Sequence, residues 1–157
     1  MMNPWVMLKV QVKRMKPHSK LTYRSGLESA IAKQLDCKGT PYCYEEYKLD
    51  YTIPESSHKY TPDFVLPNGI VIESKGIFAA DDRKKHLYIK EQHPSLDIRF
   101  VFTRSKSPLY KGAKSTYADW CIKYGFQYAD RLIPEAWLKE PIKRVPPTTV
   151  LYKWRKK

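Results

Sequence analysis

Two short apolar runs with charges embedded in them most constrain what this chain can fold into. They lie in the stretch YTPDFVLPNGIVIESKG, residues 60–76, on either side of a Pro-Asn-Gly sequence at 67–69. Short apolar runs bounded by proline and glycine are typical of two strands joined by a tight turn. Yet Asp63, Glu73 and Lys75 stand where buried strands are normally apolar. The sequence therefore predicts a hairpin that is both buried and charged.

The length of the turn decides which side chains meet. With a two-residue turn, Asp63 and Glu73 would emerge on opposite faces of the hairpin. With a three-residue loop over 67–69, proline suits the first corner, asparagine the second, and glycine the left-handed position that closes a bulged hairpin. Asp63 then faces Glu73, and Lys75, two residues further along the strand, shares that face. The three-residue loop is the geometry that makes a site.

Two carboxylates and a lysine on an apolar sheet are costly unless something neutralises them. Mg²⁺ suits this purpose, because it takes a few carboxylate oxygens and keeps water and substrate phosphate in its other positions. Such an ion polarises a phosphoryl oxygen, while a nearby lysine orients the attacking water or offsets charge in the transition state. The pattern thus indicates metal-assisted phosphodiester hydrolysis. The alternative is a structural Asp63 at a strand start, with Glu73 and Lys75 paired on an exposed face.

The charge of the chain indicates a polyanionic partner. Of 157 residues, 29 are Lys or Arg and 16 are Asp or Glu, a net charge of +13, which favours nucleic acid over a merely basic or ribosome-associated role. The length predicts one domain. The three cysteines lack disulfide or zinc spacing, and we find no membrane span or signal peptide, so an intracellular, soluble protein is expected.

Helix and strand patterns alternate along the chain, which predicts an α/β fold. The stripe formed by Tyr117, Trp120, Cys121 and Tyr124 indicates core packing rather than a platform for stacking bases. The expected elements are a strand or basic arm over 5–13, a helix from Ser25 with its apolar stripe at Leu27, Ala30, Ile31, Gln34 and Leu35 and its stop at Gly39, a strand over 42–53 broken at 54–58, strands over 64–66 and 70–74, a helix over 81–92 capped by Asp81-Asp82, a strand over 96–103, a helix from Ser115 to Gly125, and a short helix over 134–139.

Glu28 has two interpretations. Ser25-Gly26-Leu27-Glu28 is a capping-box pattern, in which the Glu28 carboxylate reaches back to the Ser25 N–H and stabilises the helix start. Alternatively, Glu28 projects from the first helical turn as a further acid at the metal site. The sequence alone favours the cap.

Together these residues resemble a known family, the endonuclease I proteins of short-tailed bacteriophages, which are Holliday-junction resolvases of the PD-(D/E)XK nuclease superfamily. The resemblance covers roughly residues 22–146, and many long words in one order make it specific. The words are YRSGLE (23–28), YEEYK (44–48), YTPDFVLPNG (60–69), IESKG (72–76), DDRKKHL (81–87), EQHPSLDIR (91–99), LYKG (109–112) and ADRLIPEAWLKEP (129–141).

The resemblance implies a restriction-endonuclease-like mixed sheet flanked by helices, in an intertwined, domain-swapped homodimer. It divides the chain into a basic arm (1–21), one nuclease domain (22–146) and a basic tail (147–157). A bridge near residues 54–58 would link the halves of the dimer, and a proline-containing link too short to fold back is consistent with exchange. The expected location is the cytoplasm of the infected bacterial host.

The resemblance also implies the roles of the site residues. Asp63, Glu73, the backbone carbonyl of Ser74 and Glu28 would bind Mg²⁺, for which Mn²⁺ substitutes, and Lys75 would assist the attacking water. Glu28 would act across chains, in a composite site with the partner's acids and lysine. One departure is Cys43, at a position where relatives carry a carboxylate, with Glu45 and Glu46 close by.

Branched DNA, four-way junctions above all, is the expected substrate, selected by shape more than by sequence. The contacts with its backbone are assigned to the basic arm and to Arg24, Arg83, Lys84, Lys85 and Lys90. Two alternatives stay open: a nuclease of ordinary duplex or single-stranded DNA, and a non-catalytic basic nucleic-acid-binding module. No RNP-like aromatic motif or zinc finger supports the last.

Overall fold

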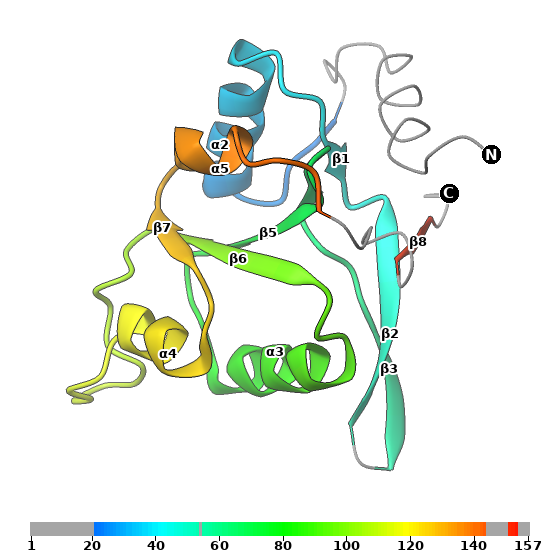
Figure 1. The fold of residues 1–157 in the computed structure, drawn as a ribbon. Coiled ribbons are helices and arrows are strands. Elements are labelled where there is room, and N and C mark those ends of the chain that lie inside the picture. Colours follow the sequence, from blue (N-terminus) through cyan, green and yellow to red (C-terminus); the bar gives the residue numbers. More distant parts are fainter. Residues whose placement is uncertain (1–20, 54, 144–150, 154–157) are drawn as a thin grey trace.

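Two β-sheets and the helices packed on them make up the described part of the chain (Figure 1). The structure is a computed structural model that describes residues 21–53, 55–143 and 151–153. The strand expected over 5–13 lies outside these residues. In chain order the elements are α2 (Gly26–Cys37), β1 (Cys43–Tyr44), β2 (Tyr47–Ile53), β3 (Ser56–Tyr60), β4 (Phe64–Val65), β5 (Ile70–Lys75), α3 (Ala80–Gln92), β6 (Asp97–Phe102), α4 (Tyr117–Tyr124), β7 (Tyr128–Asp130), α5 (Glu135–Leu138) and β8 (Tyr152–Lys153).

The main sheet is mixed, as expected. Its strand order is β1-β4-β5-β6-β7. The pairs β1/β4 and β4/β5 are antiparallel, whereas β5/β6 and β6/β7 are parallel. Parallel neighbours need a long crossover connection, and α3 supplies it between β5 and β6. A second sheet of three antiparallel strands has the order β3-β2-β8.

The charged hairpin has the predicted three-residue loop. Phe64 pairs with Ile72 and Val65 with Val71, so that position 63 stands opposite position 73. The Leu66 N–H donates to the Ile70 carbonyl at 2.9 Å, and Gly69 has a φ of 93°, which glycine tolerates without steric cost. The predicted register, which brings Asp63 opposite Glu73, is therefore confirmed.

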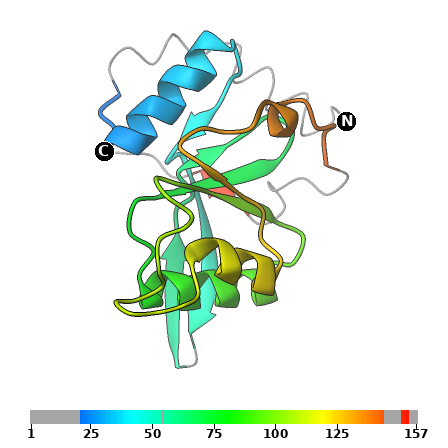
Figure 2. The same ribbon diagram turned by 90° about the vertical axis from the view of Figure 1, so that its left-hand side faces the viewer.

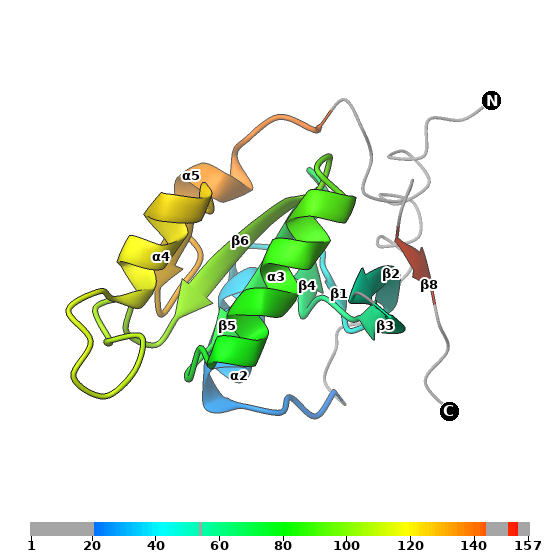
Figure 3. The same ribbon diagram turned by 90° about the horizontal axis from the view of Figure 1, so that it is seen from below.

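Helices cover both faces of the main sheet, with α3 and α4 on one face and α2 and α5 on the other (Figures 1 and 3). Side chains alternate accordingly along β6. Phe100 and Phe102 pack with Trp120 in one core cluster, whereas Val101 packs with Trp137 in the other. The predicted stripe on α4 joins the first cluster, which confirms its assignment to core packing.

The predicted helices are present, but the predicted N-terminal caps of α3 and α4 are wrong. Ser25 caps α2 as predicted, although Ala30 is exposed and Ala32 is buried in its place. α3 begins at Ala80 without any side-chain cap, and the predicted cap at Asp81-Asp82 is wrong because the Asp82 carboxylate pairs with lysines instead. α4 is capped by Thr116, one residue after the predicted start, in a capping box with Asp119.

The single strand expected over 42–53 is two strands. β1 pairs with β4 in the main sheet, and β2 pairs with β3 and β8 in the second sheet. The break falls at Glu45, which has a φ of 48° and whose N–H donates to the Asp63 carbonyl at 3.0 Å. A left-handed residue ends the extended run, so the chain leaves one sheet and enters the other.

The link after β2 does fold back, contrary to our expectation. β2 and β3 form an antiparallel hairpin in which Ile53 pairs with Ser56 and Leu49 with Tyr60. The hairpin packs beside α3 and extends away from the main sheet (Figures 1 and 2). Near the turn of the hairpin, the Gln92 amide at the end of α3 pairs with both the N–H and the carbonyl of Thr52, at 2.6 and 2.5 Å.

The C-terminal part of the chain is tied to the sheet by a buried cation. The Arg99 guanidinium on β6 donates to both carboxylate oxygens of Asp97 and both of Glu140, all at 2.7–2.9 Å. It also lies over the Trp137 ring of α5. Further along, Leu151 is buried and β8 pairs with β2, so this part of the expected basic tail is a strand.

The three cysteines all lie within the described residues and form no disulfide, with Cys37 exposed and Cys43 and Cys121 buried. No helix within the described residues has the length and the apolar character needed to cross a lipid bilayer.

Candidate active site

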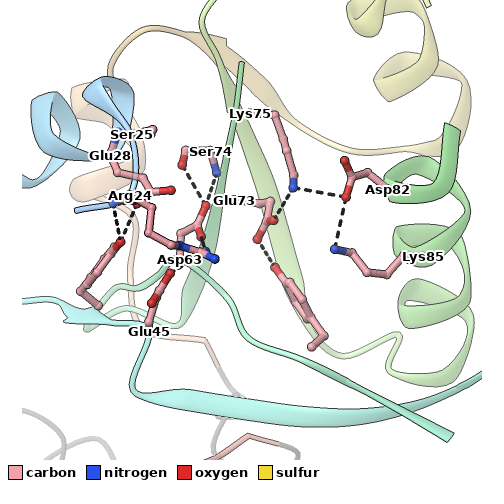
Figure 4. A network of polar contacts seen from close by, with 12 residues as sticks. Arg24, Ser25, Glu28, Glu45, Asp63, Glu73, Ser74, Lys75, Asp82 and Lys85 are labelled. Atoms are coloured by element: carbon pink, nitrogen blue, oxygen red, sulfur yellow. Dashed lines mark hydrogen bonds and ion pairs between the residues drawn. The ribbon is translucent and has the colours of Figure 1, made fainter. Parts of the chain in front are cut away.

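A polar pocket of about 270 Å³ collects the residues that the sequence analysis singled out (Figure 4). Residues from α2, β3, β5, α3 and the links between them line it, so the acids of the hairpin and of the first helix meet there. The lining residues are Arg24, Glu28, Lys59, Tyr60, Thr61, Asp63, Glu73, Ser74, Lys75 and Lys85.

Asp63 is buried and held by its neighbour on β5. One of its carboxylate oxygens accepts hydrogen bonds from both the N–H and the hydroxyl of Ser74, each at 2.8 Å. The other lies 3.5 Å from the Arg24 guanidinium. Burial, and then the charge of Glu73, raise the pKa of Asp63 from 3.8 to about 8, although the Ser74 hydrogen bonds oppose the rise. A cation bound beside this carboxyl would stabilise its ionised form and lower its pKa.

The raised pKa predicts an unusual pH dependence for the Asp63→Asn variant without metal. The folded protein holds the Asp63 proton up to about pH 8, whereas the unfolded chain loses it near 3.8. The contribution of Asp63 to the free energy of unfolding is therefore largest below about pH 4 and decreases as the pH rises to about 8. Asparagine removes that loss, so the variant should gain at least about 1 kcal/mol over wild type between pH 5 and 8.

Urea unfolding in EDTA at both pH values measures this difference. Asp81→Asn, on the exposed first turn of α3, is the matched control and should change stability by less than about 0.5 kcal/mol at either pH. Equal pH dependence in wild type and Asp63→Asn would contradict the prediction.

Glu73 is buried opposite Asp63 on the other strand of the hairpin, and its carboxylate is ionised. Its carboxylate accepts a hydrogen bond from the Tyr60 hydroxyl at 2.6 Å and lies 3.3 Å from the Lys75 ammonium. Burial alone would raise the pKa of Glu73, but His86, Lys75 and Lys85 lower it to about 2. The two acids of the hairpin thus differ in proton affinity, which is typical of functional sites.

Lys75 is a cation in this pocket. Burial alone would lower its pKa, but the carboxylates of Glu73 and Asp82, each 3.3 Å from Nζ, raise the pKa above its ordinary value. Asp82 also pairs with Lys85 at 3.4 Å. The result is a chain of alternating charges that runs from Glu73 to α3 (Figure 4).

Glu28 is not the reciprocal partner of its cap. The Ser25 hydroxyl accepts from the Glu28 N–H at 3.1 Å, as predicted. The Glu28 carboxylate, however, accepts from the Arg24 N–H at 3.0 Å and from the Tyr44 hydroxyl at 2.5 Å. Only half of the expected capping box is therefore present, and the buried carboxylate lines the pocket.

Three neighbours of the acids escaped the sequence analysis: Tyr60, His86 and the role of Glu45. His86 is fully buried on α3, with its ring 3.8 Å from the Glu73 carboxylate, and burial lowers its pKa. The Arg24 guanidinium reaches Glu45 at 2.5 Å as well as Asp63. Asp82, His86 and Ile89 are spaced by four and three residues, which places them on one face of a helix. This spacing was the signal in the sequence that could have placed His86 beside the site.

The cations assigned to DNA have different environments. Arg24 and Lys85 line the pocket, and Lys84 is exposed. Arg83, by contrast, donates to the carbonyls of Phe78 and Leu109, at 2.6 and 3.2 Å. Lys90 donates to the carbonyls of Tyr124 and Gly125 at the end of α4. Two of the five cations thus join segments of the protein.

The residues of the pocket fit a hard divalent cation. Their oxygens are the ligands that Mg²⁺ prefers, and the raised pKa of Asp63 marks a carboxylate short of positive charge. Within residues 21–53, 55–143 and 151–153, no three His, Cys, Asp or Glu side chains are grouped so as to hold a metal ion by themselves. Mg²⁺ typically uses one or two carboxylates and leaves its other positions to water and phosphate.

Fold and pocket together define the class of the protein. A mixed sheet covered by helices on both faces carries buried carboxylates and a lysine on one hairpin. This combination is typical of α/β nucleases.

The chain belongs to the phage endonuclease I family, since the family model described as Phage endonuclease I matches residues 7–157. It is similar to Endonuclease I of Escherichia phage T7, with 57% identity over 124 residues that cover 79% of this chain and 83% of the relative. It is also similar to Endodeoxyribonuclease 1 of Enterobacteria phage T3, with 59% identity over 124 residues, 79% of this chain and 82% of the relative. The family resemblance found in the sequence is confirmed, and the chain is an endonuclease.

Proposed function

We propose that the chain is a metal-dependent DNA endonuclease that resolves four-way junctions and other branches by paired phosphodiester hydrolysis, in the cytoplasm of the infected bacterial cell. The observation that carries the proposal is the pocket, where buried Asp63 and Glu73 lie beside the Lys75 ammonium. The name of the phage T3 relative supports DNA as the substrate. The net charge of +13 supports a polyanionic partner.

The residues of the pocket have separate tasks in this proposal. Asp63, Glu73, the Ser74 carbonyl and Glu28 would hold Mg²⁺, or Mn²⁺ in its place, and the ion would supply charge stabilisation and an acidic bound water. Lys75 keeps its proton beside Glu73 and Asp82. It therefore orients the attacking water and stabilises negative charge on the phosphate, rather than accepting a proton. Arg24 is placed to contact the phosphate from the other side of Asp63.

One experiment tests this function. The purified protein is incubated with a labelled four-way junction and with a linear duplex of the same sequence, in Mg²⁺ and in EDTA. Metal-dependent symmetrical nicks on the junction are expected, with little cutting of the duplex. Equal cutting of both substrates would reveal a general nuclease, and binding without cleavage a non-catalytic module.

We further propose an intertwined homodimer, in which residues 21–53 of each chain complete the other chain's pocket. The β2–β3 turn contains Glu55 with a φ of 75°, a left-handed conformation that costs a non-glycine residue about 1 kcal/mol. Opening this turn relieves the strain. It also keeps the ion pair of Arg24 with Asp63 and the pairing of β1 with β4, which would then join two chains. Two pockets in one dimer suit paired cuts at a branch.

Mixing Glu28→Ala protein with Asp63→Ala protein tests the exchange. After subunit exchange, roughly one pocket in four should regain both acids, and junction nicking should reappear. Mixing Asp63→Ala with Glu73→Ala is the matched control, because both changes lie on the same side of the turn and no pocket regains both. Nicking absent from both mixtures, with exchange verified, would count against shared pockets.

A further inference from the structure

The loop between β6 and α4 is the most basic exposed segment of the described chain outside the pocket. Its sequence from residue 104 to 115, RSKSPLYKGAKS, holds four cations and no acid. Arg104, Lys106, Lys111 and Lys114 are all exposed. None of them forms an ion pair with another described residue. Four like charges held together without a counter-charge favour an anionic partner.

The loop is built on backbone hydrogen bonds. The Tyr117 N–H donates to the Ser107 carbonyl, and the Leu109 N–H to the Ser115 carbonyl, so the two arms of the loop lie side by side. At the tip, the Ala113 N–H donates to the Tyr110 carbonyl, and Gly112 takes a φ of 85°. A loop fixed in this way presents its cations in a defined arrangement, so little order is lost when a partner binds.

The loop starts directly beside the candidate active site. The N–H of Thr103, the residue before the loop, donates to the Lys75 carbonyl at 3.1 Å. Arg83 joins the loop to the segment after Lys75, because one guanidinium nitrogen donates to the carbonyls of both Phe78 and Leu109. The loop accordingly projects beside the start of α3 and beyond α4 (Figures 2 and 3).

Two large apolar side chains are exposed where these segments meet. Ile77, two residues after Lys75, is 79% exposed, and Tyr110 at the tip of the loop is 68% exposed. Ile77 immediately precedes Phe78 and Tyr110 immediately follows Leu109, the two residues whose carbonyls Arg83 joins. An aromatic side chain among cations is typical of surfaces that bind nucleic acid, since it covers sugars and bases while the cations contact phosphates.

We propose that the loop over residues 104–114 is a second DNA-binding surface, which holds the phosphates of the DNA arm next to the cut. The proposal rests on the proposed function, because it takes DNA as the substrate of the pocket. The Thr103 N–H fixes the start of the loop to the Lys75 carbonyl on β5, and Arg83 fixes Leu109 of the loop to Phe78 just after that strand. A DNA arm held by the loop is therefore held at a fixed position relative to Lys75.

Binding of a fluorescent four-way junction in EDTA, at a series of salt concentrations, tests this surface without any cleavage step. The double variant Lys106→Gln/Lys111→Gln should reduce the slope of log affinity against log salt by about 1 for each lysine. Its affinity near 0.1 M salt should fall roughly 10-fold or more. The matched control, Lys33→Gln/Lys139→Gln, removes the same charge from exposed positions on α2 and next to α5. It should keep the wild-type slope.

An unchanged slope in the loop variant, or an equal change in both variants, would overturn the loop as a DNA-binding surface and leave the nuclease proposal intact. Wild-type protein that fails to bind DNA at all would instead overturn the proposed function, and this inference with it.

Discussion

A protein with Glu73→Gln is expected to bind branched DNA and to lose cleavage by about 10³-fold or more. Glutamine keeps the shape of the side chain and can still accept the hydrogen bond of the Tyr60 hydroxyl, so the buried position stays filled. What it removes is the negative charge that faces Lys75 at 3.3 Å and that a metal ion would share with Asp63. Lys75 keeps Asp82 as its ion-pair partner, so the fold is retained.

Single-turnover cleavage of a labelled junction in Mg²⁺, set beside junction binding in EDTA, separates the loss of chemistry from a loss of affinity. Glu135→Gln is the control, since Glu135 is an exposed acid on α5 that pairs with Lys139. It should cleave at the wild-type rate. A Glu73→Gln protein that cuts within about 10-fold of wild type would rule out the proposed catalytic role of the hairpin.

The second large effect concerns stability, and its residue is Arg99. Arg99→Met should lower the free energy of unfolding by about 3 kcal/mol. The guanidinium is only 2% exposed, and its removal leaves the carboxylates of Asp97 and Glu140 with the half-buried Lys143 as their remaining cation among the described residues. Methionine fills the space but supplies no donor, so the segment from α5 onward loses its main polar anchor.

Urea unfolding followed by circular dichroism at neutral pH measures this loss. Lys143→Met is the matched control, because Lys143 contacts Asp97 at 2.7 Å in the same network but is half-buried. It should cost less than about 1 kcal/mol. Similar losses in the two variants would mean that the burial of Arg99 does not increase its contribution to the free energy of unfolding.

Local chemistry explains why the hairpin was predictable. Each residue of the Pro-Asn-Gly sequence suits one position of a three-residue loop, and this fit favoured the three-residue loop over a two-residue turn. The resulting register brought Asp63 opposite Glu73 in the structure, without any knowledge of the rest of the fold. Side-chain alternation is a local property in the same way, and along β6 it puts Phe100 and Phe102 in one core cluster and Val101 in the other.

Long-range contacts explain the failures. The break at Glu45 accompanies a hydrogen bond to the Asp63 carbonyl, 18 residues away in sequence, which no local pattern reveals. Within the site, the same holds for His86 and Tyr60, which reach Glu73 only when α3 and β3 pack against β5. Sequence also cannot separate cations that face solvent from those that join segments, as Arg83 and Lys90 do.

The end of α3 also affects how copies of the protein can meet. An unpaired strand edge is a template on which another chain can add a strand and start aggregation. On β2, the Gln92 amide occupies the outward N–H and carbonyl of Thr52, and the His93 ring lies 2.5 Å from the Asp50 carbonyl. Side chains from a helix thus imitate a neighbouring strand, and any chain that added to this edge would first have to displace their hydrogen bonds.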